Sequence, residues 1–137
     1  MRTSTETRPR THRQLDPAWC GRVTRLGEDD AEVELATTEA MRADEHGLVH
    51  GGFVFGLADH AAMVAVDEPT VVLAAAEVRF AAPVRVGDRL VAAARVEWRE
   101  GRRRRVAVAV RRGEETVLSG SFECYVPERH VLAPREG

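Results

Sequence analysis

The stretch that decides the fold is Gly51–Val66, with the sequence GGFVFGLADHAAMVAV. Its length and alanine content predict a helix. Apolar residues occupy nearly every side of it, which is typical of a helix buried all round rather than one lying on a surface. The pair Glu68-Pro69 ends the pattern, because the residue before a proline is disfavoured in helical geometry. Asp59 and His60 interrupt the apolar run, which is too short and too polar to span a bilayer.

The chain after this helix alternates between apolar and polar residues, which predicts four strands. The first strand covers 72–80, and three more, joined by tight turns, cover 90–98, 106–110 and 118–126. Arg79 falls on the opposite face of the first strand from its apolar residues. In the first two strands the alternation assigns the following side chains to one face: Val72, Ala74, Ala76, Val78, Phe80, Leu90, Ala92, Ala94, Val96 and Trp98.

The chain before the helix predicts a hairpin, or one strand with a lead-in. Val33 and Leu35 alternate with acidic residues after the turn Gly27–Asp30, and a long loop covers 37–49. A helix that is apolar all round must be covered, and the only cover that these strands offer is one curved antiparallel sheet. We therefore expect an α+β architecture, the hotdog fold, with the sheet wrapped around one central helix.

Length and charge set the organisation of the chain. The 137 residues predict one hotdog domain at 17–130, between a flexible N-terminal arm at 1–16, which is free or draped on a partner, and a C-terminal tail at 131–137. The net charge of -2 gives no global basic field that would recruit nucleic acid or an anionic membrane. Cys20 and Cys124 lie far apart without C-x-x-C spacing, so we expect free thiols and a cytoplasmic protein.

Two segments resemble a known family. Gly47–Gly52 with the later Asp59 resembles the G-x-x-H-G-G-x-x-x-x-x-x-D signature of hotdog acyl-CoA thioesterases of the phenylacetate-pathway type, and Glu77–Asp88 resembles that family's second-strand exit. The resemblance implies that Gly51, the glycine after His50, donates its backbone N–H to the thioester carbonyl. It also implies that Asp59 acts as the nucleophile or the general base.

Two positions of this chain depart from the family pattern. Asp44 stands where the family often has Asn, and Leu73 stands where Ser or Thr positions water. Both positions are candidate substrate contacts. The departures support an alternative function, a hotdog protein that binds acyl-CoA or a related ligand without hydrolysing it.

The residues themselves also point to a site on the helix. An ionised carboxylate without partners is costly among apolar residues, so Asp59 faces a ligand, is neutralised by an arginine of the sheet, or is exposed in a gap at the edge of the fold. Gly51 and Gly52 open the helix, where free N–H groups and the dipole favour a developing oxyanion and the glycines allow close approach, unless they serve only a tight turn. Gly56 predicts close helix packing, since glycine is unfavourable inside a helix.

The spacing of these groups predicts an assembly. Eight residues separate Gly51 from Asp59, about 12 Å at 1.5 Å per residue, so one chain's pair cannot contact the same carbonyl carbon. A homodimer with antiparallel helices, or a dimer of dimers, would instead place Asp59 of one chain against Gly51 of the other.

Several other side chains are weaker candidates. We expect His50 to orient the glycine turn through a hydrogen bond, with direct acid-base chemistry as the alternative. Phe53, with its neighbours on the helix, could line an apolar acyl pocket or belong to the core. Arg79, together with Arg99 or members of the 102–105 run, could clamp coenzyme A phosphates, although a solvated edge is the simpler interpretation.

These observations favour one function over two others. We expect an acyl-CoA thioesterase that acts on a small or medium acyl group and needs no metal and no cofactor apart from the coenzyme A of its substrate. The metal interpretation is weak because the histidines lack a ligand motif. A hotdog hydratase is disfavoured, because the helix lacks the paired His and Glu of that chemistry.

Overall fold

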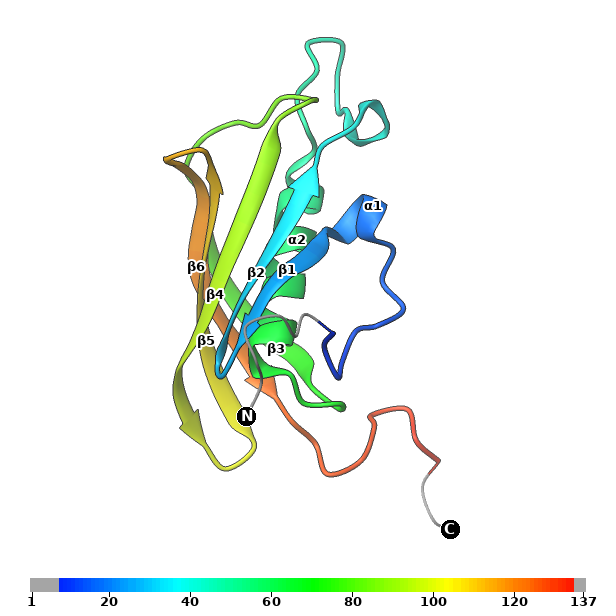
Figure 1. Cartoon of the computed structure of the whole chain (residues 1–137), viewed down its shortest axis with the longest axis vertical. Helices are drawn as coiled ribbons and strands as arrows, with labels where there is room; N and C mark the ends of the chain where they lie inside the picture. The colour runs from blue at the N-terminus through cyan, green and yellow to red at the C-terminus, as the bar shows by residue number, and fades with distance from the viewer. Residues whose placement is uncertain (1–7, 135–137) are drawn as a thin grey trace.

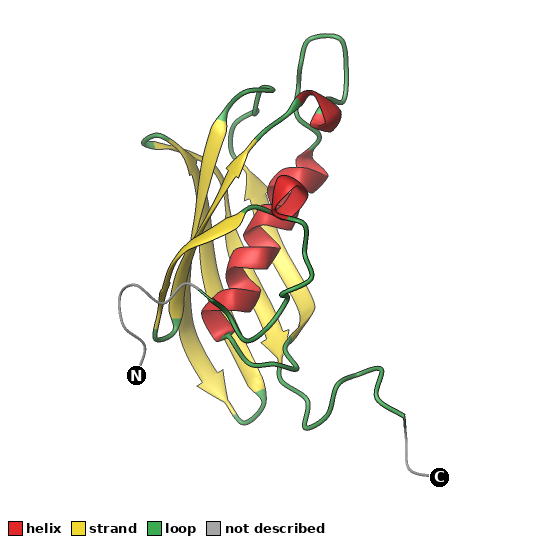
Figure 2. Cartoon of the chain, turned by 45° about the vertical axis from the view of Figure 1, so that its right-hand side comes forward, coloured by secondary structure: helices red, strands yellow, loops and turns green. Residues whose placement is uncertain are grey.

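One curved antiparallel sheet holds a single long helix against its concave face (Figures 1 and 2). The computed structural model describes residues 8–134. The strand order in the sheet is β1-β2-β4-β5-β6-β3. The elements in chain order are α1 (Pro17–Cys20), β1 (Arg22–Gly27), β2 (Asp30–Ala36), η1 (Glu39–Met41), α2 (Gly51–Val66), β3 (Val72–Phe80), β4 (Arg89–Glu100), β5 (Arg103–Arg112) and β6 (Glu115–Tyr125).

The helix α2 has the bounds that the sequence predicts and forms the centre of the core. Leu57, Ala58, Ala61 and Val64 have no solvent exposure, because the sheet covers them. Burial of this apolar surface is the main force that holds the helix to the sheet. The α+β hotdog architecture is therefore confirmed, and the predicted hairpin before the helix is β1 paired with β2.

Two β-bulges change which side chains face the core. The register shifts between Leu73 and Ala75 in β3, so that Leu73, rather than Val72, lies opposite the buried Cys124. A second shift after Val96 places Trp98 opposite Arg105. The face predicted for Val72, Ala74 and Trp98 was wrong, because one extra residue in a strand reverses the alternation beyond it.

Trp98 is stabilised by its new neighbours on the outer face. The guanidinium groups of Arg103 and Arg105 lie 5.7 Å and 5.1 Å from the centre of its ring, within cation–π range. Arg104, between them in sequence, instead lines a cavity on the inner side of the sheet together with Arg99. The arginine run therefore divides between two faces, as strand geometry requires.

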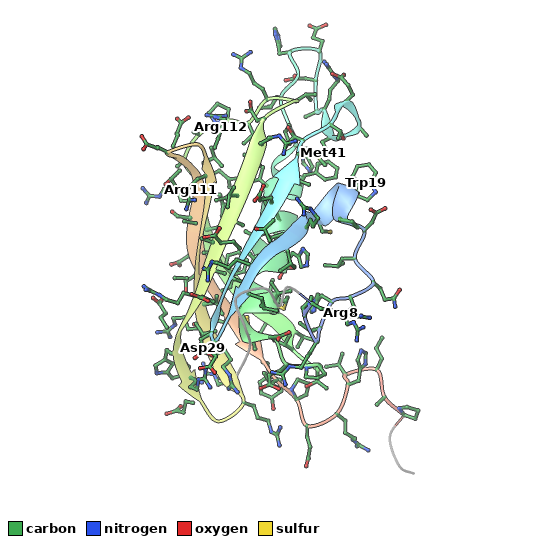
Figure 3. The ribbon with its side chains drawn as sticks, viewed as in Figure 1. Arg8, Trp19, Asp29, Met41, Arg111 and Arg112 are labelled. Atoms are coloured by element: carbon green, nitrogen blue, oxygen red, sulfur yellow. The ribbon has the colours of Figure 1, made fainter. Side chains whose placement is uncertain are left out.

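The described N-terminal residues lie against α2 of their own chain. The backbone N–H of Arg10 donates to the Asp67 carboxylate at 2.6 Å, and Thr11 is buried. Farther along, the ring of Trp19, which Figure 3 labels, stacks on Phe53 with 5.6 Å between ring centres. Residues 8–16 of the predicted flexible arm thus follow the outer face of the helix, and residues 1–7 lie outside the described part of the chain.

The two edges of the sheet differ in length, because β3 has nine residues and β1 has six. Within residues 8–134, β3 is hydrogen-bonded only to β6, and its residues 74–77 are exposed. The described part of the C-terminal tail leaves Leu132 84% exposed, and residues 135–137 lie outside the described chain. The long β3 edge is therefore the part of the sheet most open to pairing with another chain.

Candidate active site

Asp59 places a carboxylate among the apolar residues of α2. Its neighbours Ala58 and Ala62 have no solvent exposure, and its Oδ1 atom is buried with no hydrogen-bond partner among residues 8–134. Burial raises the pKa of Asp59 to about 6. A carboxyl group with this pKa is mostly ionised at neutral pH yet basic enough to accept a proton, which suits general-base chemistry.

The two cysteines do not compete with Asp59 as nucleophiles. Burial, and secondarily the negative charge of Asp59, raises the pKa of the Cys124 thiol to about 12. The pKa of the Cys20 thiol is raised by the same two causes, with a further contribution from Asp16. Both thiols stay protonated at neutral pH, whereas the reactive form of cysteine is the thiolate.

The raised pKa of Asp59 predicts a stability cost that depends on pH. The folded pKa of about 6 exceeds the ordinary value of 3.8, so the fold loses stability as pH rises between these values. Asp59→Asn removes the charge, and we expect it to raise the free energy of unfolding by about 1 kcal/mol near pH 8. This gain in stability is modest because the side chain is only partly buried. Near pH 3.5 the gain should vanish. Urea unfolding at both pH values, with Glu97→Gln as the exposed control, measures the difference, and an Asn variant less stable near pH 8 would contradict it.

The N-terminus of α2 presents free backbone donors. Gly51 and Gly52 occupy the first turn, where the helix itself supplies no acceptor for an N–H group. A Cβ atom built on Gly51 would lie 3.3 Å from the ring of Phe80, so this amide lies beside an aromatic side chain. The positive end of the helix dipole adds to the attraction of this turn for negative charge.

His50 anchors this turn through its backbone rather than its ring. The His50 N–H donates to the Met41 carbonyl at 3.0 Å, and the His50 carbonyl accepts from Phe53. The side chain makes no capping hydrogen bond, and its exposed ring meets Phe53 edge-on at 6.1 Å between centres. The predicted orienting hydrogen bond of the His50 ring was therefore wrong.

Asp44 shapes the loop that precedes the helix. Its Oδ1 atom accepts hydrogen bonds from the backbone N–H groups of His46, at 2.9 Å, and Leu48, at 3.2 Å. Aspartate commonly closes turns in this way. The structure thus gives Asp44 a local structural role one loop away from the helix N-terminus.

Three other candidate contacts lie apart from the Gly51 amide. Phe53 is stacked against Trp19, and Leu73 packs against the core opposite Cys124. Arg79 precedes Phe80 on β3, so its side chain leaves the opposite face of the strand from the ring that meets Gly51. The structure therefore does not bring these three together with the Gly51 amide in one chain.

Gly56 leaves open space instead of supporting close packing. A Cβ atom built at this position would meet no atom of the described chain within 4 Å. The packing role predicted for Gly56 was therefore wrong within one chain. Because Gly56 lies one helical turn before Asp59, it widens the room available on that side of α2.

A cavity of about 340 Å³ lies next to the Gly51 amide. Its wall comes from the loop before α2, the first turn of α2, the end of β3 with the segment that follows it, and β6. The lining residues are Leu48, Val49, Gly51, Val54, Phe80, Ala81, Ala82, Pro83, Val84 and Val117. Apart from Gly51, the sequence predicted a pocket role within this set only for Val54, one of the helix neighbours of Phe53, because contacts between distant segments build the cavity.

A second cavity, of about 690 Å³, lies at the opposite end of α2. Its lining is of mixed charge, and part of it is paired internally, because Arg10 bonds Asp67 and Arg99 bonds Asp29. Within residues 8–134 no group of three His, Cys, Asp or Glu side chains is placed to hold a metal ion. Of these two cavities, the apolar one beside Gly51 adjoins the backbone donors at the N-terminus of α2.

Comparisons with known proteins agree with the hotdog architecture. A crystal structure of the uncharacterized protein PH1136 from Pyrococcus horikoshii is 55% identical, with a TM-score of 0.91 over 92% of this chain and 97% of that one. The PaaI protein of the phenylacetic acid degradation operon of E. coli is 25% identical, with a TM-score of 0.69 over 75% of this chain and 80% of that one.

Two curated relatives match parts of longer proteins. Methylthioribose-1-phosphate isomerase of Aquifex aeolicus is 46% identical over 113 residues, 82% of this chain and 25% of the relative. Transcription factor FapR of Bacillus cereus is 39% identical over 80 residues, 57% of this chain and 41% of the relative. The chain thus spans less than half the length of either. The family model described as Thioesterase superfamily matches residues 46–119, more than half of the chain, which therefore belongs to the thioesterase superfamily.

Proposed function

We propose that this chain hydrolyses the thioester bond of acyl-CoA in a site shared between two copies. The observation that carries the proposal is the half-buried carboxylate of Asp59, on the same helix as the Gly51 amide. Its Oδ1 atom is buried without a hydrogen-bond partner among the described residues, and its pKa is raised to about 6. Buried polar groups without partners are rare in folded proteins, and they concentrate where a ligand completes them. Membership of the thioesterase superfamily supplies the class of chemistry.

The proposed reaction uses the two groups in different roles. Asp59 accepts a proton from a water molecule, whose oxygen attacks the thioester carbonyl carbon. The negative charge that develops on the carbonyl oxygen is stabilised by the Gly51 N–H of the other copy and by the helix dipole. The carbon–sulfur bond then breaks, and the coenzyme A sulfur takes the proton from Asp59, which leaves a carboxylic acid and a free thiol.

The proposed assembly uses the edge strand β3. This strand offers unpaired backbone groups over nine residues, with small exposed side chains at Ala74, Ala75 and Ala76 that allow close approach. A second copy pairing there would bring two α2 helices near the same interface. Because Gly51 and Asp59 of one chain lie about 12 Å apart, such a dimer would supply both groups to one thioester.

We also propose a reducing, cytoplasmic location. The two cysteines of the chain are free thiols in the structure, and free thiols are typical of proteins from reducing compartments. Among the described residues, no helix combines the length and apolar content needed to cross a membrane.

A thiol-release assay with a panel of acyl-CoAs tests the proposal. We expect saturable turnover far above the spontaneous rate for at least one apolar acyl-CoA, and an oligomer of even subunit number by light scattering. Turnover no faster than buffer alone over the whole panel would contradict the proposal.

A non-catalytic ligand-binding role is the second candidate. It is favoured by Leu73, an apolar side chain packed against the core where the resemblance implies a hydroxyl that positions water. The similarity to Transcription factor FapR over 80 residues also supports this role, because that relative is named as a transcription factor and not as a hydrolase. Calorimetry with a non-hydrolysable acyl-CoA analogue separates the two, since tight binding without turnover would support this role.

A further inference from the structure

We propose that the cavity beside Gly51 accepts only uncharged hydrocarbon acyl groups, and that Phe80 is its specificity-determining residue. This inference rests on the proposed thioesterase function, because it uses the Gly51 amide to place the thioester carbonyl at the cavity mouth. An acyl chain that starts at this carbonyl would then extend along the apolar wall described above.

The lining offers nothing to a charged acyl group. None of its side chains carries an ionisable or hydrogen-bonding group. Several backbone groups of the wall are already paired: the Val49 N–H donates to the Val84 carbonyl at 2.8 Å, and the Ala81 N–H donates to the Val117 carbonyl at 2.8 Å. A second carboxylate on the acyl group would lose its water and gain no partner, which is strongly unfavourable.

The wall is formed before any ligand arrives. Arg112 at the end of β5, labelled in Figure 3, donates to the Pro83 carbonyl at 2.8 Å and pairs with Asp88 at 2.8 Å. These bonds fix both ends of the segment 83–88 that follows β3. A preformed apolar pocket gains affinity because little of the binding free energy is spent on ordering the protein.

Phe80 has the most exposed large side chain of the lining. It is 53% exposed, although its ring lies against Gly51, so an acyl chain beside the amide would cover the exposed part. Arg79, its neighbour on β3, extends from the other face of the strand and places no charge in the cavity. Phe80 is therefore placed to contact the acyl chain close to the Gly51 amide, which would bind the reacting carbonyl.

The first test compares two acyl groups of equal carbon number. We expect kcat/KM for hexanoyl-CoA to exceed that for adipoyl-CoA, in which a carboxylate replaces the terminal methyl group, by at least about 100-fold. Equal rates, or a preference for adipoyl-CoA, would overturn the proposal.

The second test isolates Phe80. Phe80→Ala should lower kcat/KM for hexanoyl-CoA by about 10-fold and that for acetyl-CoA much less, while Phe80→Leu retains most of the preference for the longer chain. Leu132→Ala, which removes an exposed apolar side chain from the tail, serves as the matched control and should change neither value. An equal loss for both substrates in Phe80→Ala would show a merely structural role and overturn the assignment.

A binding measurement separates failure of this proposal from failure of the hydrolase function. S-hexyl-CoA and S-(5-carboxypentyl)-CoA are thioethers that cannot be hydrolysed, so their affinities do not depend on Asp59 chemistry. Tighter binding of the hexyl compound, by at least about 10-fold, supports the apolar pocket even if no acyl-CoA is turned over. Equal binding of the two, or binding of neither, overturns it whatever the hydrolysis assay shows.

Discussion

Asp59→Asn should lower kcat for a good acyl-CoA substrate by at least about 100-fold while leaving the fold intact. The amide keeps the size of the side chain but cannot accept a proton from water. The fold should survive because the replaced charge is itself unfavourable in its buried position. Thiol release under saturating substrate, with circular dichroism of the same sample, measures both quantities.

The pH profile of the native chain should report the same group. Because the base is active when ionised, kcat/KM should rise with pH through the Asp59 pKa of about 6 and level off above it. In the Asp59→Asn variant, the residual kcat/KM should no longer rise with pH in this range. Glu97→Gln, a carboxylate removed from an exposed position on β4, should retain the native profile. An Asp59→Asn variant with native kcat would contradict the proposed role.

Gly51→Pro should lower kcat by about 100-fold to 1,000-fold by deleting one oxyanion donor. Proline is well tolerated at the first position of a helix, where its missing N–H has no partner within the helix. The residue before it, His50, already has the extended backbone that a following proline requires, with φ of -61° and ψ of 131°. The variant should therefore fold while losing the donor.

Gly51→Ala is the matched control for this deletion. It keeps the N–H group and adds a methyl group 3.3 Å from the Phe80 ring, which must shift slightly. We expect a loss of at most about 10-fold, smaller than that of Gly51→Pro. If both variants lost activity equally, crowding against Phe80 rather than the missing donor would be the cause, and the oxyanion role would be wrong.

The fold was predictable because its decisive features are local. A largely apolar stretch, interrupted only by Asp59 and His60, fixed the position of α2 at Gly51–Val66, and period-two alternation located β3 to β6. The two bulges were not predictable, because nothing in a run such as Leu73-Ala74-Ala75 marks the extra residue, yet it reverses every face beyond it. The misplaced face of Trp98 has the same cause.

The candidate site was only partly predictable for a related reason. The Gly51 and Asp59 positions follow from their place on one helix, whereas the apolar cavity depends on the hydrogen bond between Val49 and Val84, which are far apart in sequence. Phe80 carried a detectable signal as the last apolar residue of a strand that precedes Ala81-Ala82-Pro83, but strand alternation assigns such a residue to the core. The ring of His50 was misjudged because backbone bonds already hold the turn.

The shared site is tested most directly by mixing two inactive variants, Asp59→Asn and Gly51→Pro. In a mixed dimer one site keeps both groups and the other loses both, so each mixed dimer should have about half the native activity. Random exchange of equal amounts makes about half of the dimers mixed, and the total should recover to about a quarter of the native value. If Gly51 and Asp59 served one thioester within a single chain, every site would stay damaged. An absence of recovery, with exchange verified by mass spectrometry and both variants folded, would contradict the shared site.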